Sequence, residues 1–148
     1  MTVNPSDERE KKQFLVTVKR ISQQRARAQA HGQALDLAIK GGDPSLGFTA
    51  PETLLAAFGA CILSNVNRIA AAEGLQIEDA QIVFEGLKRN DPPGIDPLRY
   101  RLTIRSSEAA DKLQELYQKA TTDGTATNAL LNGLKPLSQL EIQPVLKA

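Results

Sequence analysis

Cys61 is the only sulfur nucleophile in this 148-residue sequence. A thiolate can attack an electrophile or be oxidised, whereas an uncharged buried thiol acts as a small packing residue. If the surrounding segment is helical, Leu54 and Phe58 give the face of Cys61 an apolar N-terminal side. Asn65 and Arg68 give the same face a polar C-terminal side. A face of this mixed kind is typical of a cleft edge.

Other chemistries that need clustered side chains find no support in the sequence. His31 is the only histidine, and it precedes Cys61 by thirty positions without a second clustered pair of ligands. The sequence therefore predicts no zinc or iron site, and we expect no metal and no cofactor. No nucleophile-elbow motif accompanies His31, which argues against Ser-His-Asp hydrolysis. With Gly32, His31 fits a hairpin turn, and we interpret it as a turn residue.

Composition narrows the class of protein further. The length and the mass of 16.0 kDa fit a single domain, which we place at 13–148. Residues 1–12 are highly charged and poor in apolar side chains, so we interpret them as a flexible tail before that domain. A net charge of +1 and 4% aromatic residues without tryptophan argue against nucleic acid as a partner. A single cysteine cannot form an intrachain disulfide, and the N-terminus lacks a secretion pattern. We expect a cytoplasmic, reduced protein.

The element that must position Cys61 is the apolar segment from Thr49 to Gly74. Thr49 and Glu52 have the spacing of a capping box, and Gly74 stands where a left-handed C-cap is usual. Apolar residues recur between them at steps of three and four, as in a helix. Ser64 and other polar residues interrupt the second half, so the pattern predicts a buried core helix and not a membrane span.

Around this helix the sequence predicts strands and two shorter helices, segregated along the chain. Alternating apolar and polar residues predict strands at about 14–19, 25–30, 34–39, 82–87 and 98–105, and a weaker one at 138–146. The residues 90–97 are predicted as a loop. Ser106 or Ser107 is expected to cap a helix with Leu113, Leu116, Tyr117 and Ala120 as its apolar stripe, and 126–131 predict a further short helix. This arrangement indicates an α+β fold.

A resemblance to a known family is carried by the segment GGDPSLGFTAPETLLAAFGACILSNVNRIAAAEGLQIEDAQIVFEG. It resembles the first half of the OsmC/Ohr proteins, the osmotically induced and organic-hydroperoxide-resistance thiol peroxidases, and the resemblance extends from about Phe14 to the C-terminus. It implies an intertwined homodimer, with curved antiparallel sheets around two central cysteine-bearing helices and active sites between the subunits. Cys61 would be the peroxidatic cysteine, oxidised to a sulfenic acid by a hydroperoxide.

The resemblance also implies partners for Cys61. Glu52 matches the family's glutamate at the start of the cysteine helix, although it precedes Cys61 by nine residues and falls on the opposite side of one helix. A partner subunit could bring it round, and capping is its equally adequate structural role. Arg25 is our choice for the family's activating arginine, with Arg27 in the same region. Arg68, seven residues after Cys61, is interpreted as a cation at the helix end.

Gly124 occupies the position that matches the family's second, resolving cysteine. The sequence GTATNAL stands where the family has a Cys-Pro-Val-Ser-Asn-Thr-Leu-like motif, and no other cysteine exists in the chain. The intramolecular disulfide of a two-cysteine cycle is therefore excluded.

Two functional hypotheses remain from the sequence. In the first, Cys61 reduces organic hydroperoxides and is restored by an external thiol, such as a lipoyl or low-molecular-weight dithiol. In the second, a catalytically inactive dimer of the same fold binds a small apolar ligand in the cleft between its subunits. A third role, regulation through mixed disulfides at Cys61, completes the set.

Overall fold

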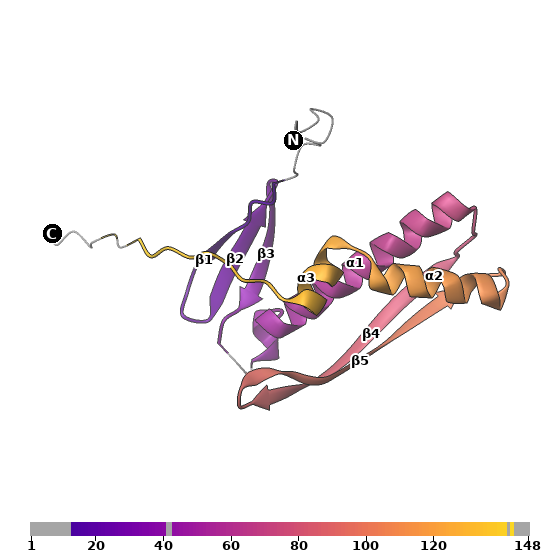
Figure 1. Cartoon of the computed structure of the whole chain (residues 1–148). Coiled ribbons are helices and arrows are strands. Elements are labelled where there is room, and N and C mark those ends of the chain that lie inside the picture. The colour runs from indigo at the N-terminus through magenta and orange to yellow at the C-terminus, as the bar shows by residue number, and fades with distance from the viewer. Residues whose placement is uncertain (1–12, 41–42, 142, 144–148) are drawn as a thin grey trace, which may run out of the picture. The chain divides into compact units, whose positions relative to one another are not determined.

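The computed structural model describes residues 13–40, 43–141 and 143 of the chain. This part of the chain forms three α-helices, a short 3-10 helix and two antiparallel sheets, which confirms the predicted α+β class. It divides into two compact units, residues 1–54 and 55–148, which are described separately (Figure 1). The prediction of one domain over 13–148 stays a prediction, and the predicted tail 1–12 lies outside the described residues.

The first unit is built on a three-stranded antiparallel sheet in the order β1-β2-β3. Its strands are β1 (Thr17–Arg20), β2 (Arg25–Ala30) and β3 (Gln33–Ala38). His31 and Gly32 join β2 to β3 with φ of +52° and +75°, which is the backbone of a tight hairpin turn. The turn assignment of His31 is thereby confirmed. Strand β1 begins at Thr17, three residues after the predicted start at Phe14.

The first unit buries little of its own apolar surface. Among residues 13–40 and 43–54, the buried apolar side chains are the small ones of Ala26 and Ala38. Larger apolar side chains of this unit stay about half exposed or more: Phe14, Leu15, Val16, Val18, Ile21, Leu35, Ile39, Phe48 and Leu54. A bidentate pair between Arg27 and Asp36, with N–O distances of 2.7 and 3.1 Å, spans the outer face of β2 and β3. The short helix η2 (Pro44–Leu46) follows this sheet.

Helix α1 (Ala50–Glu73) confirms the predicted central helix and both of its ends. At its start the Glu52 carboxylate accepts a hydrogen bond from the Thr49 N–H at 2.8 Å, as in a capping box. At its end Gly74 adopts φ +69°, and the N–H of Leu75 donates to the carbonyl of Ala70 at 2.8 Å. These are the bonds of a Schellman motif, which satisfies carbonyls that the last turn leaves free.

The second unit has a core between α1 and the elements that follow it. Its buried cluster contains Val66, Ile69, Ala70, Leu75, Leu116 and Ala120. Both Leu116 and Ala120 come from α2 (Ala110–Thr122), so the predicted apolar stripe of this helix is confirmed. By length and composition α1 could cross a membrane, with a mean hydropathy of 1.5. Its buried side chains, Ile62 and Val66 among them with 0% exposure, instead identify it as a core helix.

Figure 1 shows α1 and α2 on the same side of a long two-stranded hairpin, β4 (Asp79–Asn90) and β5 (Pro93–Arg105). Along β5 the side chains of Leu98, Tyr100, Leu102 and Ile104 are half-buried, and those between them are exposed, as predicted. The predicted loop 90–97 is wrong, because Asn90 already pairs with Pro93 and only residues 91–92 form the turn. Each strand of a two-stranded sheet has one edge without a partner, and a proline whose nitrogen faces that edge removes no ladder bond.

Two further expectations are corrected. Neither Ser106 nor Ser107 caps α2, because the helix begins later, with Ala109 as its N-cap. The Ser106 hydroxyl accepts from the Glu108 N–H at 3.1 Å, before the helix begins, and donates to the Gln76 carbonyl at 2.6 Å. The predicted strand at 138–146 does not form in the residues described there, 138–141 and 143, and the others lie outside the described residues. The last helix, α3 (Thr125–Asn132), agrees with the prediction and ends at Gly133 with φ +75°.

Candidate functional site

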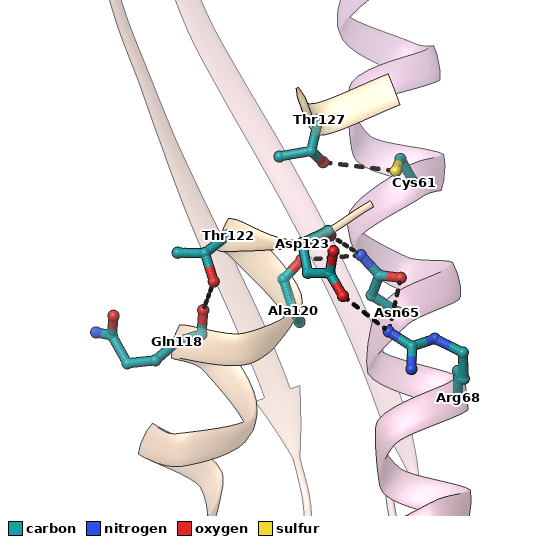
Figure 2. Close-up of polar contacts among 8 residues, drawn as sticks. All are labelled: Cys61, Asn65, Arg68, Gln118, Ala120, Thr122, Asp123 and Thr127. Carbon is teal, nitrogen blue, oxygen red and sulfur yellow. Dashed lines mark hydrogen bonds and ion pairs between the residues drawn. The ribbon is translucent and has the colours of Figure 1, made fainter. Parts of the chain in front are cut away.

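The thiol of Cys61 lies between the middle of α1 and the start of α3. Cys61 is half-buried, and its Sγ accepts a hydrogen bond from the Thr127 hydroxyl at 3.5 Å (Figure 2). Thr127 itself is 0% exposed, so its hydroxyl has no solvent to turn to and remains directed at the sulfur. Two elements far apart in the sequence are therefore joined at the only cysteine.

The surroundings of Cys61 favour the thiolate. Burial raises the pKa of the thiol, but three hydrogen bonds act in the opposite direction. They come from the Thr127 hydroxyl and from the backbone N–H groups of Thr127 and Ala126, in the first turn of α3. The nearby Asp123 carboxylate raises the pKa, and the net result is a pKa below the ordinary value. First-turn N–H groups of a helix lack internal partners, which leaves them available to a negative sulfur.

Gly124 brings the backbone unusually close to this thiol. It adopts φ +135° and ψ 152°, a combination that L residues rarely adopt. A Cβ at this position would lie 2.7 Å from the Cys61 Sγ and 2.7 Å from the Asn65 Nδ2. Position 124, which the resemblance predicts to match the family's resolving cysteine, is thus directly beside Cys61 and has no room for a side chain unless its neighbours move.

A cluster of polar side chains one helical turn after Cys61 connects α1 to the end of α2. The Asn65 side chain is 7% exposed, and its Nδ2 donates to the carbonyls of Ala120, at 3.3 Å, and Asp123. Arg68 donates to the Asn65 Oδ1 at 3.5 Å and pairs with the Asp123 carboxylate at 3.7 Å. Figure 2 shows these contacts one turn along α1 from the thiol. Arg68 therefore contacts Asp123 and Asn65, beyond the helix-end role predicted for it.

Sequence reasoning found Cys61 but missed Thr127 and Asn65. Asn65 lies 55 and 58 residues from the two backbone carbonyls that it binds, and Thr127 lies 66 residues from Cys61, so no local spacing connects them. Asn65 did stand out as a polar residue on the face of Cys61, and that signal could have identified it. Thr127 gave a signal only through the resemblance of its segment to the family's second motif.

Glu52 and Arg25, the two predicted catalytic partners, belong to the first unit, whereas Cys61 belongs to the second. Glu52 has a structural role, because it caps the first turn of α1. Arg25 begins β2 with an exposed side chain, and its N–H donates to the Ser22 hydroxyl at 3.0 Å. The catalytic roles of both residues stay predictions. Among the described residues, no group of three His, Cys, Asp or Glu side chains could hold a metal ion.

The fold and the site together define a class: an α+β protein whose single cysteine lies on a long helix and faces the first turn of another. The family model of the OsmC-like proteins matches residues 41–136. The chain therefore belongs to the OsmC-like protein family. Comparison with curated protein sequences gives no significant match.

Several solved structures share this fold. The OsmC-like protein of Mycoplasma pneumoniae has a TM-score of 0.75 at 19% identity, covering 82% of this chain and 89% of that one. An organic hydroperoxide resistance protein OsmC from Legionella pneumophila has a TM-score of 0.62 at 17% identity, with 82% and 91% covered. The organic hydroperoxide resistance protein OhrB of Bacillus subtilis has 0.56 at 16%, with 79% and 89% covered. At these identities the likeness establishes the fold.

Proposed function

We propose that this protein reduces organic hydroperoxides through Cys61 alone and is returned to the thiol by an external dithiol. The observation that carries the proposal is the hydrogen bond from the Thr127 hydroxyl to the Cys61 sulfur at 3.5 Å, beside backbone N–H groups of the same helical turn that lower the pKa of the thiol. A cysteine kept only for packing in apolar surroundings has a raised pKa, whereas donors directed at the sulfur lower it. Two fold relatives are named as organic hydroperoxide resistance proteins, which supports the same substrate class.

The chemistry needs only the thiolate and two reactants. The Cys61 thiolate attacks the terminal oxygen of the hydroperoxide, the O–O bond breaks, and the alkoxide leaves and takes up a proton. Cys61 is then a sulfenic acid. One thiol of an external dithiol attacks the sulfur and releases water, which forms a mixed disulfide, and its second thiol displaces Cys61 as the reduced thiol. The dithiol is thereby oxidised to a disulfide, and the peroxide is reduced to an alcohol and water.

Each residue at the site has a role in this scheme. The Thr127 hydroxyl and the first N–H groups of α3 stabilise the thiolate before attack. Arg68 pairs with Asp123 and so reduces the repulsion between that carboxylate and the thiolate. We retain Arg25 as the proposed cation and Glu52 as the proposed carboxylate of the complete site. Both are part of the proposal that the active protein is a homodimer.

A homodimer is supported by the exposed apolar side chains of the first unit. A sheet normally covers one face with apolar partners, and the described residues of this unit supply only Ala26 and Ala38 as buried apolar side chains. A second copy of the chain would provide such cover, and dimers are common among OsmC-like proteins. The same proposal includes a cytoplasmic location, where small dithiols keep cysteines reduced.

Turnover with a synthetic organic hydroperoxide tests the function directly. The wild-type protein is expected to consume cumene hydroperoxide in the presence of excess dithiothreitol or dihydrolipoamide, and Cys61→Ser is expected to lose this activity. Because Cys61 is half-buried and Ser is nearly isosteric, the variant should remain folded, which circular dichroism can establish.

The second hypothesis, an inactive dimer that binds an apolar ligand, predicts a different result. Cys61 would stay reduced in the presence of peroxide with every dithiol, and native mass spectrometry would detect a co-purified lipid or aromatic compound. That pair of results would contradict the reductase.

A further inference from the structure

Asn65 is a buried polar residue whose side-chain amide binds the backbone where α2 turns into α3. It lies one helical turn after Cys61 on α1 and is 7% exposed. Its Nδ2 donates to two backbone carbonyls, those of Ala120 and Asp123 (Figure 2). A buried amide that lost these partners would be costly, so the contacts are strongly favoured.

These two carbonyls belong to the C-terminal end of α2. The last carbonyls of a helix have no partner within the helix, and here the Asn65 amide supplies one from another element. Asp123 is already extended, with φ −126° and ψ 146°, and Gly124 then turns the chain into α3. The Asp123 carbonyl that Asn65 binds therefore lies one residue before Gly124 and a few residues before Ala126 and Thr127, which donate to the thiol.

The orientation of the Asn65 amide is itself determined by its neighbours. Arg68 donates to Oδ1 at 3.5 Å, which directs Nδ2 toward the two carbonyls and satisfies both ends of the amide. Arg68 also pairs with the Asp123 carboxylate at 3.7 Å, on the same turn whose backbone Asn65 binds. The Asp123 charge therefore acts on the Cys61 thiol, and Arg68 contacts both Asp123 and Asn65.

We infer that Asn65 is a positioning residue, which fixes the first turn of α3 against the Cys61 thiol by holding the backbone at the end of α2. The inference rests on the proposed function, because it assigns Asn65 to the activation of that nucleophile. A purely structural Asn65 would stabilise the fold without any effect on the thiol. A positioning Asn65 sets how well the donors of α3 stabilise the thiolate, and so it changes the pH at which the thiol reacts.

The pH dependence of alkylation by iodoacetamide separates these roles in the folded protein. For Asn65→Ala we expect about fivefold slower alkylation near neutral pH, as for the loss of about one hydrogen bond to the thiolate. The rate at high pH, where every thiol is ionised, should be unchanged or slightly higher. Asn67→Ala is the matched control, since Asn67 is the same residue type on an exposed face of α1 and should leave the profile unchanged. A lower melting temperature with an unaltered pH profile in Asn65→Ala would overturn the inference.

Should Asn65→Ala fail to fold, Arg68 provides a second test, because its side chain is 60% exposed and its loss is tolerable. Arg68→Gln removes both the contact to the Asn65 Oδ1 and the pairing of Asp123, whereas Arg68→Lys keeps the charge. We expect slower neutral-pH alkylation in Arg68→Gln that persists at 1 M salt, where the effect of the Asp123 charge is screened. A slowing that disappears at 1 M salt would assign the effect to the Asp123 charge alone and overturn the role of Asn65.

Neither test uses a peroxide, so the inference and the proposed function can fail separately. An altered alkylation profile in Asn65→Ala together with a wild-type protein that does not consume hydroperoxide would retain the positioning role and refute the reductase. Normal hydroperoxide turnover in the wild type with an unaltered alkylation profile in Asn65→Ala would support the reductase and refute the positioning role.

Discussion

The two units of the chain bury their apolar side chains to very different extents. The second unit places large side chains such as Ile62, Val66 and Leu116 at 0% exposure, and it contains the cysteine with its donors. The described part of the first unit buries only two alanines among its apolar residues, while its larger apolar side chains stay exposed. The second unit therefore has a core of its own, whereas the described residues of the first unit leave most of their larger apolar side chains exposed.

The buried apolar core and the contacts of the Cys61 thiol both lie in the second unit, whereas the exposed strands lie in the first. The Cys61 thiol and the groups of α3 that donate to it all belong to the second unit. The proposed partners Arg25 and Glu52 belong to the first unit, so the complete active site that we propose requires residues of both units.

The largest expected effect is a change in the core of the second unit. Leu116→Ala should lower the free energy of unfolding by about 2–5 kcal/mol, because it leaves a cavity at a fully buried site. Val18→Ala in the first unit should cost about 0.5 kcal/mol or less in a monomer, since Val18 is exposed. Urea unfolding measures both. If a dimer covers Val18, its cost should exceed this value and grow with protein concentration, which would sharpen the comparison.

The next effect concerns the two glycines that flank α3. Gly124 and Gly133 both have backbone angles that L residues rarely adopt, so replacing either with Ala should cost about 1–3 kcal/mol from strain. Only Gly124→Ala also places a Cβ against the Cys61 sulfur, whereas the position of Gly133 is open. We therefore expect Gly124→Ala to be the more destabilising and to alter the alkylation rate of Cys61. Equal effects of the two substitutions on that rate would contradict the geometry of the site.

A smaller effect is expected at the hydroxyl that contacts the thiol. Thr127→Val keeps the shape of the side chain but removes its donor, and should slow iodoacetamide alkylation near neutral pH about fivefold. Thr127→Ser keeps the hydroxyl and serves as the control, with a profile close to the wild type. A Thr127→Val profile identical to the wild type would show that the backbone N–H groups alone stabilise the thiolate.

The smallest effect is on the pH dependence of stability. The pKa of Cys61 lies below the ordinary value of 9.0, because the donors of α3 outweigh burial, so the unfolded chain binds more protons between the two values. The contribution of Cys61 to stability is fully present above pH 9 and is lost as the pH falls through the folded-state pKa. In the wild type, the melting temperature relative to Cys61→Ser should rise across that window. A constant difference between the two proteins would count against a stabilised thiolate.

How much could be predicted from the sequence depends on the range of the interactions. The ends of α1 were predictable because Glu52 and Gly74 act on backbone within a few residues of themselves. The start of α2 was not, because the Ser106 hydroxyl binds the Glu108 N–H and the distant Gln76 carbonyl, and the helix begins only after Ala109. The loop predicted at 90–97 was wrong, because the pairing of β4 with β5 continues to Asn90 and Pro93.

The site follows the same rule. Cys61 could be identified because no other residue in the chain has its chemistry. The donors of α3 and the Asn65 anchor could not be derived, because they come together only when helices far apart in the sequence pack side by side. Local patterns give the elements, and the tertiary fold decides which of their polar groups meet.

The central claim is that Cys61 is oxidised by an organic hydroperoxide without help from a second cysteine. The most direct measurement is intact-protein mass spectrometry after one equivalent of cumene hydroperoxide, in the presence of a sulfenic-acid trap such as dimedone. The account predicts one trap adduct per chain, which peptide mapping locates at Cys61. The adduct should not form when a dithiol is added before the trap. An unmodified chain together with unconsumed hydroperoxide would contradict it.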